Sequence, residues 1–417
     1  MKRIRESSQI SFALVLVLVF GLAQAAPREV HDHHWVDVER IVAIGDLHGD
    51  YDNYMQALRA AGIVDRRGRW DAGETHLVQT GDIPDRGPAT RKIIEHMARL
   101  ARQARRSGGR VHNLIGNHEA MNVYGDLRYV INEEYAEFAT ARSERFRDRY
   151  FDAVLKDLEQ RDPKRFANLP ENFREQWYEE HPPGWIEHRQ AWDPRWNPDG
   201  EMFQWVMDSR VSIQINDLIF VHGGISGFYC RDSLESMTDR AHAALERSDP
   251  EDLGILTDEY GPLWYRGLAG MAPETPVETV EAILEQHQAS HIVIGHTPTG
   301  GFIWPRYAGR VIQIDTGIGS AYGGHVAYLE VTPEGMFAGY RSGRVELPEG
   351  GNDLIAYLES VIELLPENRA ARERLQQLRQ LESQESESEN TGTSRVAASS
   401  NEQAGPTASV PICGTRL

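Results

Sequence analysis

The stretch Ile41-Val-Ala-Ile-Gly-Asp-Leu-His-Gly49 is a short apolar run that ends abruptly at a glycine. Four apolar residues followed by glycine are typical of a buried strand that leads into a tight turn. The turn carries Asp46 and His48, and an acid and an imidazole two residues apart suit one metal ion. Taken alone, the stretch is better explained as a plain turn, but the chain repeats the arrangement four more times.

Each repeat consists of an apolar run and a turn with a polar side chain. The further runs are residues 76–79, 111–115, 218–221 and 292–294. The polar side chains after the five runs are Asp46, His48, Asp82, Asn117, His222 and His296. Because the carboxyl ends of strands in an open α/β sheet form the rim where such folds bind ligands, we expect these side chains to converge.

The converging set contains two aspartates, one asparagine and three histidines, with no thiolate. This mixture suits Mn, Fe or Zn better than Ca, and it offers too many ligands for one tetrahedral zinc. A carboxylate shared by two divalent ions accommodates the set, and two metals ~3.5–4 Å apart commonly hydrolyse phosphate esters. A bridging water, with its pKa lowered from ~15.7 towards ~7, would then be the nucleophile.

Three further side chains in these turns suit acid catalysis and phosphate binding. His118 could protonate the leaving alkoxide, and Asp85 could hold its imidazole in the required tautomer. Arg86 could form paired hydrogen bonds with phosphate oxygens. Alternatively, Asp85 and Arg86 form a turn-stabilising pair and His118 caps a helix. The metal interpretation favours the catalytic roles.

The first 25 residues have the features of a secretory signal peptide: a basic start, an apolar run at 10–23 and the small-x-small site Ala23-Gln-Ala25. The run is shorter than the ~20 residues of a spanning helix, so we expect a periplasmic or secreted protein without a stable membrane span after cleavage. The 417-residue chain has a net charge of −19, or −21 without this segment. Such an acidic chain without a basic stripe is not expected to bind nucleic acid.

Residues 26–382 are expected to form one large domain with a helical insertion at about 125–205. The segment 383–417 is polar and is predicted to be a disordered tail. Four tryptophans of the insertion could line a substrate groove, although a small helical core is the favoured interpretation. They are Trp177, Trp185, Trp192 and Trp196.

The chain has two cysteines, Cys230 and Cys413, which are too few for a disulfide framework. Cys230 is followed by serine at position 236, so the Cys-x5-Arg signature of cysteine phosphatases is missing. We therefore interpret Cys230 as a buried thiol.

The motifs occur in a fixed order between residue 41 and about residue 331: Gly-Asp-Leu-His-Gly, Gly-Asp-Ile-Pro-Asp-Arg-Gly, Gly-Asn-His-Glu, His-Gly-Gly and Gly-His. This series resembles the phosphoprotein phosphatase family of the calcineurin-like metallophosphoesterases. The long insertion, Gly-Pro-Leu-Trp-Tyr-Arg-Gly and Gly-His-Thr-Pro resemble its Shewanella-like protein phosphatase branch. The resemblance implies a two-sheet α/β sandwich with flanking helices.

The resemblance also implies roles for individual residues. One metal would be bound by Asp46, His48 and Asp82. The other would be bound by Asp82, Asn117, His222 and His296. His118 would be the acid, supported by Asp85, with Arg86 on the phosphate. Arg266 is our candidate for the family's second phosphate-binding arginine, and Tyr322 for the tyrosine of its C-terminal signature.

We therefore expect a phosphomonoesterase with two divalent metal ions that acts on a phosphorylated protein or a small phosphoester. A nucleotide or dinucleoside polyphosphate hydrolase of the same fold is the alternative, which the long insertion and the Trp-Tyr-Arg loop disfavour. A non-catalytic metal-binding or interaction protein is a third interpretation. The presence of every ligand type together with His118 argues against it.

Overall fold

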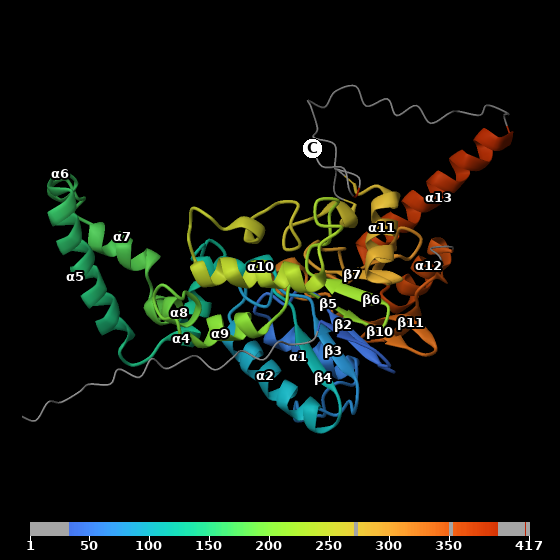
Figure 1. Ribbon diagram of the computed structural model, residues 1–417, viewed down its shortest axis with the longest axis horizontal. Helices are drawn as coiled ribbons and strands as arrows, with labels where there is room; N and C mark the ends of the chain where they lie inside the picture. Colours follow the sequence, from blue (N-terminus) through green and yellow to red (C-terminus); the bar gives the residue numbers. More distant parts are fainter. Residues whose placement is uncertain (1–32, 271–273, 350–352, 391–412, 414–417) are drawn as a thin grey trace, which may run out of the picture. The chain divides into compact units, whose positions relative to one another are not determined.

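The computed structural model describes residues 33–270, 274–349, 353–390 and 413. Two six-stranded sheets form its centre (Figure 1). The first contains, in spatial order, β1 (His34–Trp35), β5 (Ser212–Ile215), β6 (Leu218–Val221), β7 (His291–Ile294), β9 (Val311–Gln313) and β8 (Trp304–Arg306). The second contains β12 (Gly343–Glu346), β11 (Gly335–Tyr340), β10 (Ala327–Thr332), β2 (Ile41–Ile44), β3 (His76–Gln79) and β4 (Arg110–Asn113).

The residues of β2 alternate between two hydrophobic cores. Ile41 and Ala43 belong to a core that also contains Phe220 of β6, so this core lies between the two sheets. Val42 and Ile44 belong to a second core, which contains apolar residues of the flanking helices. Successive side chains of a strand point to opposite faces, so burial of both faces requires the uninterrupted apolar run seen in the sequence.

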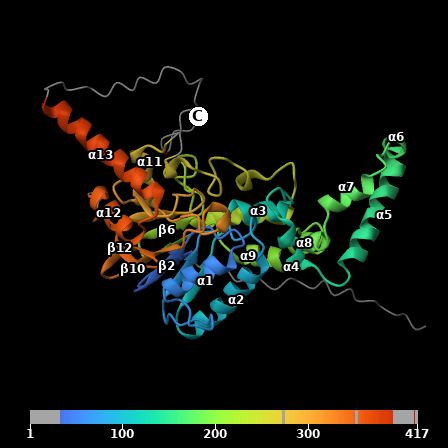
Figure 2. The same ribbon diagram turned by 180° about the vertical axis from the view of Figure 1, so that it is seen from behind.

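Helices cover both sheets (Figures 1 and 2). Among those that contribute to the second core are α1 (Tyr51–Ala60), α2 (Thr90–Arg106), α3 (Asn117–Tyr124), α10 (Leu234–Arg247) and α11 (Val277–His287). Two more pack onto the core between the sheets, α12 (Leu354–Leu364) and α13 (Arg369–Asn390). The short 3-10 helices are η1 (Gly254–Leu256), η2 (Gly267–Ala269) and η3 (Ser320–Tyr322). The fold is thus the predicted two-sheet α/β sandwich with flanking helices.

Strand direction brings the functional turns together. β2, β3 and β4 are parallel neighbours in one sheet. β6, β7 and β9 are parallel neighbours in the other. Parallel strands end at the same edge of a sheet, so each sheet presents its turns as a group.

The segment between α3 and β5 is helical. It contains α4 (Asn132–Phe138), α5 (Ser143–Arg161), α6 (Pro163–Ala167), α7 (Phe173–Glu180), α8 (Trp185–Trp192) and α9 (Glu201–Asp208). Helix α8 contacts both α4 and α9 (Figure 2). The ring of Tyr150 lies within 6.1 Å of the rings of Trp177, Trp185 and Trp196, and Trp192 is fully buried. Trp177, Trp185 and Trp196 therefore gather around Tyr150 within the helical segment, as the favoured interpretation states, whereas Trp192 belongs to the second core.

Two predictions about the cysteines and the tail are wrong. Cys230 is buried as predicted, but it is not a free thiol, because it forms a disulfide with Cys413. The two residues are 183 positions apart, so no local spacing could reveal the pairing. Helix α13 continues to Asn390 and so includes the first eight residues of the segment predicted to be disordered.

Other predicted segments lie outside the described residues. These are the signal peptide at 1–25 and the tail from 391 onwards, except for Cys413. Within the part of the chain that the structure describes, no helix combines the length and apolarity required to span a bilayer.

Candidate metal centre

The metal-ligand candidates at the strand ends occupy turns with unusual backbone geometry. His48, Asp82 and His296 all have positive φ angles, of 45°, 58° and 65°. Such left-handed conformations are uncommon for residues other than glycine and concentrate at functional sites. Gly81 shows how tight the packing is, because a Cβ atom there would lie 2.9 Å from His222 Nδ1. The backbone of these turns thus adopts the uncommon conformations that a functional site requires, which a simple chain reversal would not need.

Asp82 is common to two compact groups of potential metal ligands. In the first group, ligand atoms of Asp82, His48 and His118 lie within 4.8 Å of one another. In the second, the same holds for Asp82, His222 and His296. All five residues are buried. The carboxylate expected to bridge two ions therefore stands where the two groups meet.

In the second group, several nitrogen and oxygen atoms that can act as metal ligands lie close together, with too few hydrogen atoms for each to form a hydrogen bond. His222 Nδ1 lies 2.8 Å from Thr80 O, which places a proton on Nδ1. Burial would lower the pKa of His222, but Asp82 outweighs it and raises that pKa, so a positive charge is favoured at Nε2, whether it is a proton or a metal ion. That Nε2 lies 3.0 Å from Asn117 Oδ1, 3.2 Å from His296 Nδ1 and 3.3 Å from Asp82 Oδ2. His296 Nε2 is buried without a hydrogen-bond partner among the described residues. Such a cluster fits a divalent cation.

His48 is prepared in the same way. Its Nδ1 lies 3.2 Å from Pro84 O, which leaves Nε2 for a metal. Burial lowers the pKa of His48 to about 3, so the imidazole is neutral at pH 7. A neutral imidazole is the form that binds a metal ion.

Asp46 lies beside these groups rather than within one of the two compact sets. Its carboxylate accepts hydrogen bonds of 3.2 Å from the backbone N–H of His296. Burial and the neighbouring charges of Asp315 and Asp82 raise the pKa of Asp46 well above its usual value. Burial also raises the pKa of Asp315, to about 6. The raised pKa values of Asp46 and Asp315 show that these two buried carboxylates lack sufficient positive charge around them, which a metal ion would supply.

His118 and Asp85 form the predicted pair. His118 Nδ1 lies 2.5 Å from Asp85 Oδ2, and Asn122 Nδ2 donates a 3.0 Å hydrogen bond to Asp85 Oδ1. Burial would lower the pKa of His118, but Asp82 and Asp85 outweigh it and the pKa is raised. The imidazole is thus favoured in its protonated form, and Asp85 orients it.

Arg86 lies between two tyrosine rings. Its guanidinium carbon is 4.3 Å from the centroid of Tyr129 and 5.2 Å from that of Tyr322. The same tyrosines also contact imidazole rings. The ring centroids of Tyr129 and His118 are 5.1 Å apart, and those of Tyr322 and His48 are 4.9 Å apart. Arg86 Nε has no hydrogen-bond partner among the described residues. The two rings therefore hold Arg86 next to the ligands, with a donor available for an anion.

Arg266 also contacts the site. Its Nη1 donates 2.9 Å hydrogen bonds to His296 O and to Thr297 Oγ1. Both hydrogen bonds are donated by Nη1, so neither of them involves Nε or Nη2. The arginine is thus anchored to a metal-ligand candidate.

Two cavities flank the site. One has a volume of about 660 Å³, and Arg266 and Tyr129 are among its lining residues. The other has a volume of about 360 Å³, and His48, Arg86 and Lys92 are among its lining residues. The two arginines therefore stand at the walls of separate spaces beside the ligand groups.

Glu119 is a site residue that the sequence analysis missed. Its Oε2 accepts 2.8 Å hydrogen bonds from the backbone N–H groups of Asp82 and Gly116, and its Oε1 accepts one from Ile83. Glu119 thereby ties two of the metal-ligand turns together. Burial, with repulsion from Asp82, raises the pKa of Glu119 to about 7. The sequence shows Glu119 in the Gly-Asn-His-Glu motif, but it does not show which backbone N–H groups the side chain binds.

Glu134 and Tyr129 were also missed, and both lie between β4 and β5, in the long segment that includes the insertion. Glu134 is fully buried, and its Oε1 lies 3.5 Å from the backbone N of Asp85. Tyr129 O accepts a 3.0 Å hydrogen bond from the backbone N–H of Arg86. No local pattern marks either residue, because their role follows from how this segment packs against the Asp85–Arg86 turn.

Comparisons with known proteins agree with this geometry. The family model described as calcineurin-like phosphoesterase matches residues 39–300. An uncharacterized protein of Schizosaccharomyces pombe is 32% identical over 70% of this chain and 77% of its own length. Shewanella-like protein phosphatase 2 of Arabidopsis thaliana is 29% identical over 67% of this chain and 71% of its own.

A solved structure gives the same result. The cold-active protein-tyrosine phosphatase of a psychrophilic Shewanella species superposes with a TM-score of 0.57 and 29% identity, covering 76% of this chain and 83% of that one. The family model spans more than half of the chain and includes every metal-ligand candidate. The protein is therefore a hydrolase that belongs to the calcineurin-like phosphoesterase family, with Shewanella-like protein phosphatases among its relatives.

Proposed function

We infer that this chain is a metal-dependent phosphomonoesterase that removes phosphate from phosphorylated proteins. The observation that carries the proposal is the position of Asp82, which belongs to both groups of potential metal ligands. The names of the Arabidopsis and Shewanella relatives, both protein phosphatases, support the substrate class.

Two divalent ions, Mn, Fe or Zn, fit the ligand chemistry of the site. Asp46, His48 and Asp82 would hold one. Asp82, Asn117, His222 and His296 would hold the other. When bound, such a pair supplies an activated water molecule and polarises the phosphoryl oxygens. His48 and His222 are prepared for this role by hydrogen bonds that keep their protons on Nδ1.

His118 acts as the general acid in this proposal. Its pKa is raised, so the proton needed by the leaving oxygen is present near neutral pH. Asp85 accepts from Nδ1 and thereby keeps the Nε2 proton directed into the site. Asn122 holds Asp85 in turn, so the dyad is oriented before the substrate arrives.

Arg86 and Arg266 bind the phosphate oxygens. The guanidinium of Arg86 contacts the rings of Tyr129 and Tyr322, and its Nε has no hydrogen-bond partner among the described residues. A planar guanidinium matches the geometry of phosphate oxygens better than an ammonium group does. Tyr322 also lines the site through its contact with His48.

We further propose that the protein is exported to the periplasm or secreted. The signal-like first 25 residues support this, as does the Cys230–Cys413 disulfide. Disulfides form and persist in oxidising compartments and are rare in the cytosol.

The central experiment measures metal content and phosphate release on the purified mature chain. We expect about two divalent ions per chain, loss of activity after chelation and recovery when Mn²⁺ is restored. Phosphopeptides should be hydrolysed faster than diadenosine tetraphosphate. Full activity of the metal-free protein would overturn the mechanism, and preference for the dinucleotide would overturn the substrate class.

A further inference from the structure

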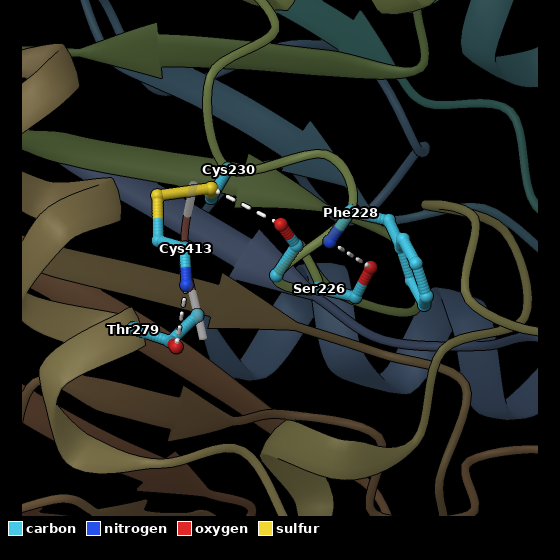
Figure 3. The surroundings of a disulfide bond; sticks show 6 residues. Ser226, Phe228, Cys230, Thr279 and Cys413 are labelled. Atoms are coloured by element: carbon cyan, nitrogen blue, oxygen red, sulfur yellow. Dashed lines mark hydrogen bonds between the residues drawn. A yellow bond between two sulfur atoms is a disulfide. The ribbon is translucent and has the colours of Figure 1, made fainter. Parts of the chain in front are cut away.

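The disulfide lies next to two segments that contact the loop carrying Arg266. One is the segment between β6 and Cys230, and the other is the start of α11. Cys230 follows β6 and its ligand His222, and it is 2% exposed. Cys413 bonds to it with a Cα–Cα distance of 5.8 Å. The backbone N–H of Cys413 also donates a 3.3 Å hydrogen bond to Thr279 Oγ1 in the first turn of α11 (Figure 3). Cys413 thus connects the segment after β6 with α11.

The segment next to Cys230 is attached to the Arg266 loop at several points. Tyr229 donates a 2.7 Å hydrogen bond from its hydroxyl to Asp258 Oδ2, and Asp258 Oδ1 accepts from the backbone N–H of Tyr260. The ring of Phe228 packs on Tyr260 at a centroid distance of 5.0 Å. Near the start of the segment, Gly223 N donates to Pro262 O at 2.8 Å. The position of residues 258–262 therefore depends on the segment that Cys230 terminates.

The same loop continues without a break to Arg266. Gly261 O accepts hydrogen bonds from the backbone N–H groups of Trp264 and Tyr265. Arg266 follows directly and bonds to His296 O and Thr297 Oγ1. A shift of residues 258–262 would therefore move Arg266, which is one of the residues that line the 660 Å³ cavity.

The far side of the loop is attached to the start of α11. The hydroxyls of Tyr265 and Thr275 lie 2.6 Å apart, and Thr275 N donates to Gly267 O. Thr279, the partner of Cys413, lies four residues beyond Thr275 and is fully buried. Cys413 is therefore connected to the Arg266 loop in two ways, through Cys230 and through Thr279 of α11.

We propose that the Cys230–Cys413 disulfide positions Arg266 and so makes substrate affinity depend on the redox state of this bond. Reduction adds two electrons and two protons from a reductant, breaks the S–S bond and leaves two thiols. Oxidation by a dithiol–disulfide oxidant reverses this. The cysteines are positioning residues, since they lie outside the ligand groups. The inference rests on the proposed function, in which Arg266 binds phosphate.

Reduction should raise KM and change kcat little. The ligand turns remain held by sheet pairing and by Glu119, so the chemistry is preserved. Arg266 would contact the phosphate in both the bound substrate and the transition state, and loss of such uniform binding appears in KM. We expect a rise of about fivefold or more, the lower end of the coupling between linked sites.

The test uses the whole mature chain with its metals, assayed with an aryl phosphate and a phosphopeptide before and after reduction by a phosphine. Because the chain has two cysteines in all, the reductant has one disulfide to act on. The variant Cys230→Ser/Cys413→Ser should show the raised KM without reductant and no response to it. That variant controls for any effect of the phosphine on the metals. Orthophosphate should also inhibit the reduced enzyme more weakly.

A second readout separates positioning from simple stabilisation. Amide hydrogen exchange should increase in residues 256–266 after reduction and stay unchanged in β3. An unchanged KM accompanied by a lower melting temperature would overturn the inference, because the bond would then act only on stability. If the serine variants do not fold, reversible reduction of the natural chain with thiol counting gives the same comparison. Absence of phosphatase activity in both redox states would instead overturn the proposed function.

Discussion

Asp85 Oδ2 lies 2.5 Å from His118 Nδ1, while Asn122 holds the other carboxylate oxygen. We predict that Asp85→Asn lowers kcat by about 10²- to 10⁴-fold for alkyl phosphates, the usual contribution of general acid catalysis. An amide carries no negative charge to stabilise the protonated imidazole, and when its oxygen accepts from Asn122 its NH₂ group faces His118 Nδ1 and favours the wrong tautomer. Aryl phosphates, whose leaving oxygens need less protonation, should lose much less activity. Equal losses for both substrates would show that His118 does not protonate the leaving group.

The stacking of Arg86 on Tyr129 gives a second prediction. Tyr129→Leu removes a ring whose centroid lies 4.3 Å from the guanidinium, and KM should rise about two- to fivefold, as expected for loss of a cation–π contact of ~0.5–1 kcal/mol. Tyr129→Phe keeps the ring and is the matched control. Steady-state kinetics with an aryl phosphate measures both. A rise in KM for the phenylalanine variant as well would assign the effect to the hydroxyl instead.

Glu119 links the Asp82 and Gly116 turns through backbone N–H groups. In Glu119→Gln, the side-chain NH₂ would face a backbone donor, so the turns should separate and metal affinity should fall by about 10- to 100-fold. Metal competition titration measures this. Glu137→Gln is the control, because Glu137 accepts from the backbone N–H of Arg91 at the start of α2, away from the ligands. Similar losses of affinity in both variants would contradict the prediction.

His188 should make stability depend on pH. It is fully buried between Tyr135 and Phe138, with neither ring nitrogen hydrogen-bonded among the described residues. Burial lowers its pKa to about 3. Below pH ~6.5 the unfolded chain binds a proton that the folded chain excludes, so the stability falls as pH decreases from ~6.5 towards 3.

The variant His188→Leu removes this titration. Between pH 7 and pH 5 the natural chain should lose about 2 kcal/mol more of its free energy of unfolding than the variant loses. Urea denaturation at the two pH values measures the difference. His76, whose pKa burial lowers to about 4, is present in both proteins and cancels in the comparison. Parallel losses in the two proteins would show that His188 exchanges its proton freely in the folded state.

Much of the site was predictable because its chemistry is local. Each metal-ligand candidate comes shortly after a short strand, and the parallel arrangement of strands brings such turns to one edge. His118 and Asp85 were predictable for the same reason, since they stand in the turns next to Asn117 and Asp82. The order of the motifs was enough to predict the sandwich fold.

The tertiary structure alone decided which distant groups support these turns. Glu119 could be seen in the Gly-Asn-His-Glu motif. Two of the three backbone N–H groups that it binds, however, belong to Asp82 and Ile83, in the turn that follows a different strand. Tyr129 joins Arg86 to His118 only because the residues before α4 fold back over the turn. The pairing of Cys230 with Cys413 spans 183 positions. Local patterns reflect the periodicity of strands and turns, whereas contacts between remote segments depend on packing, which no spacing in the sequence encodes.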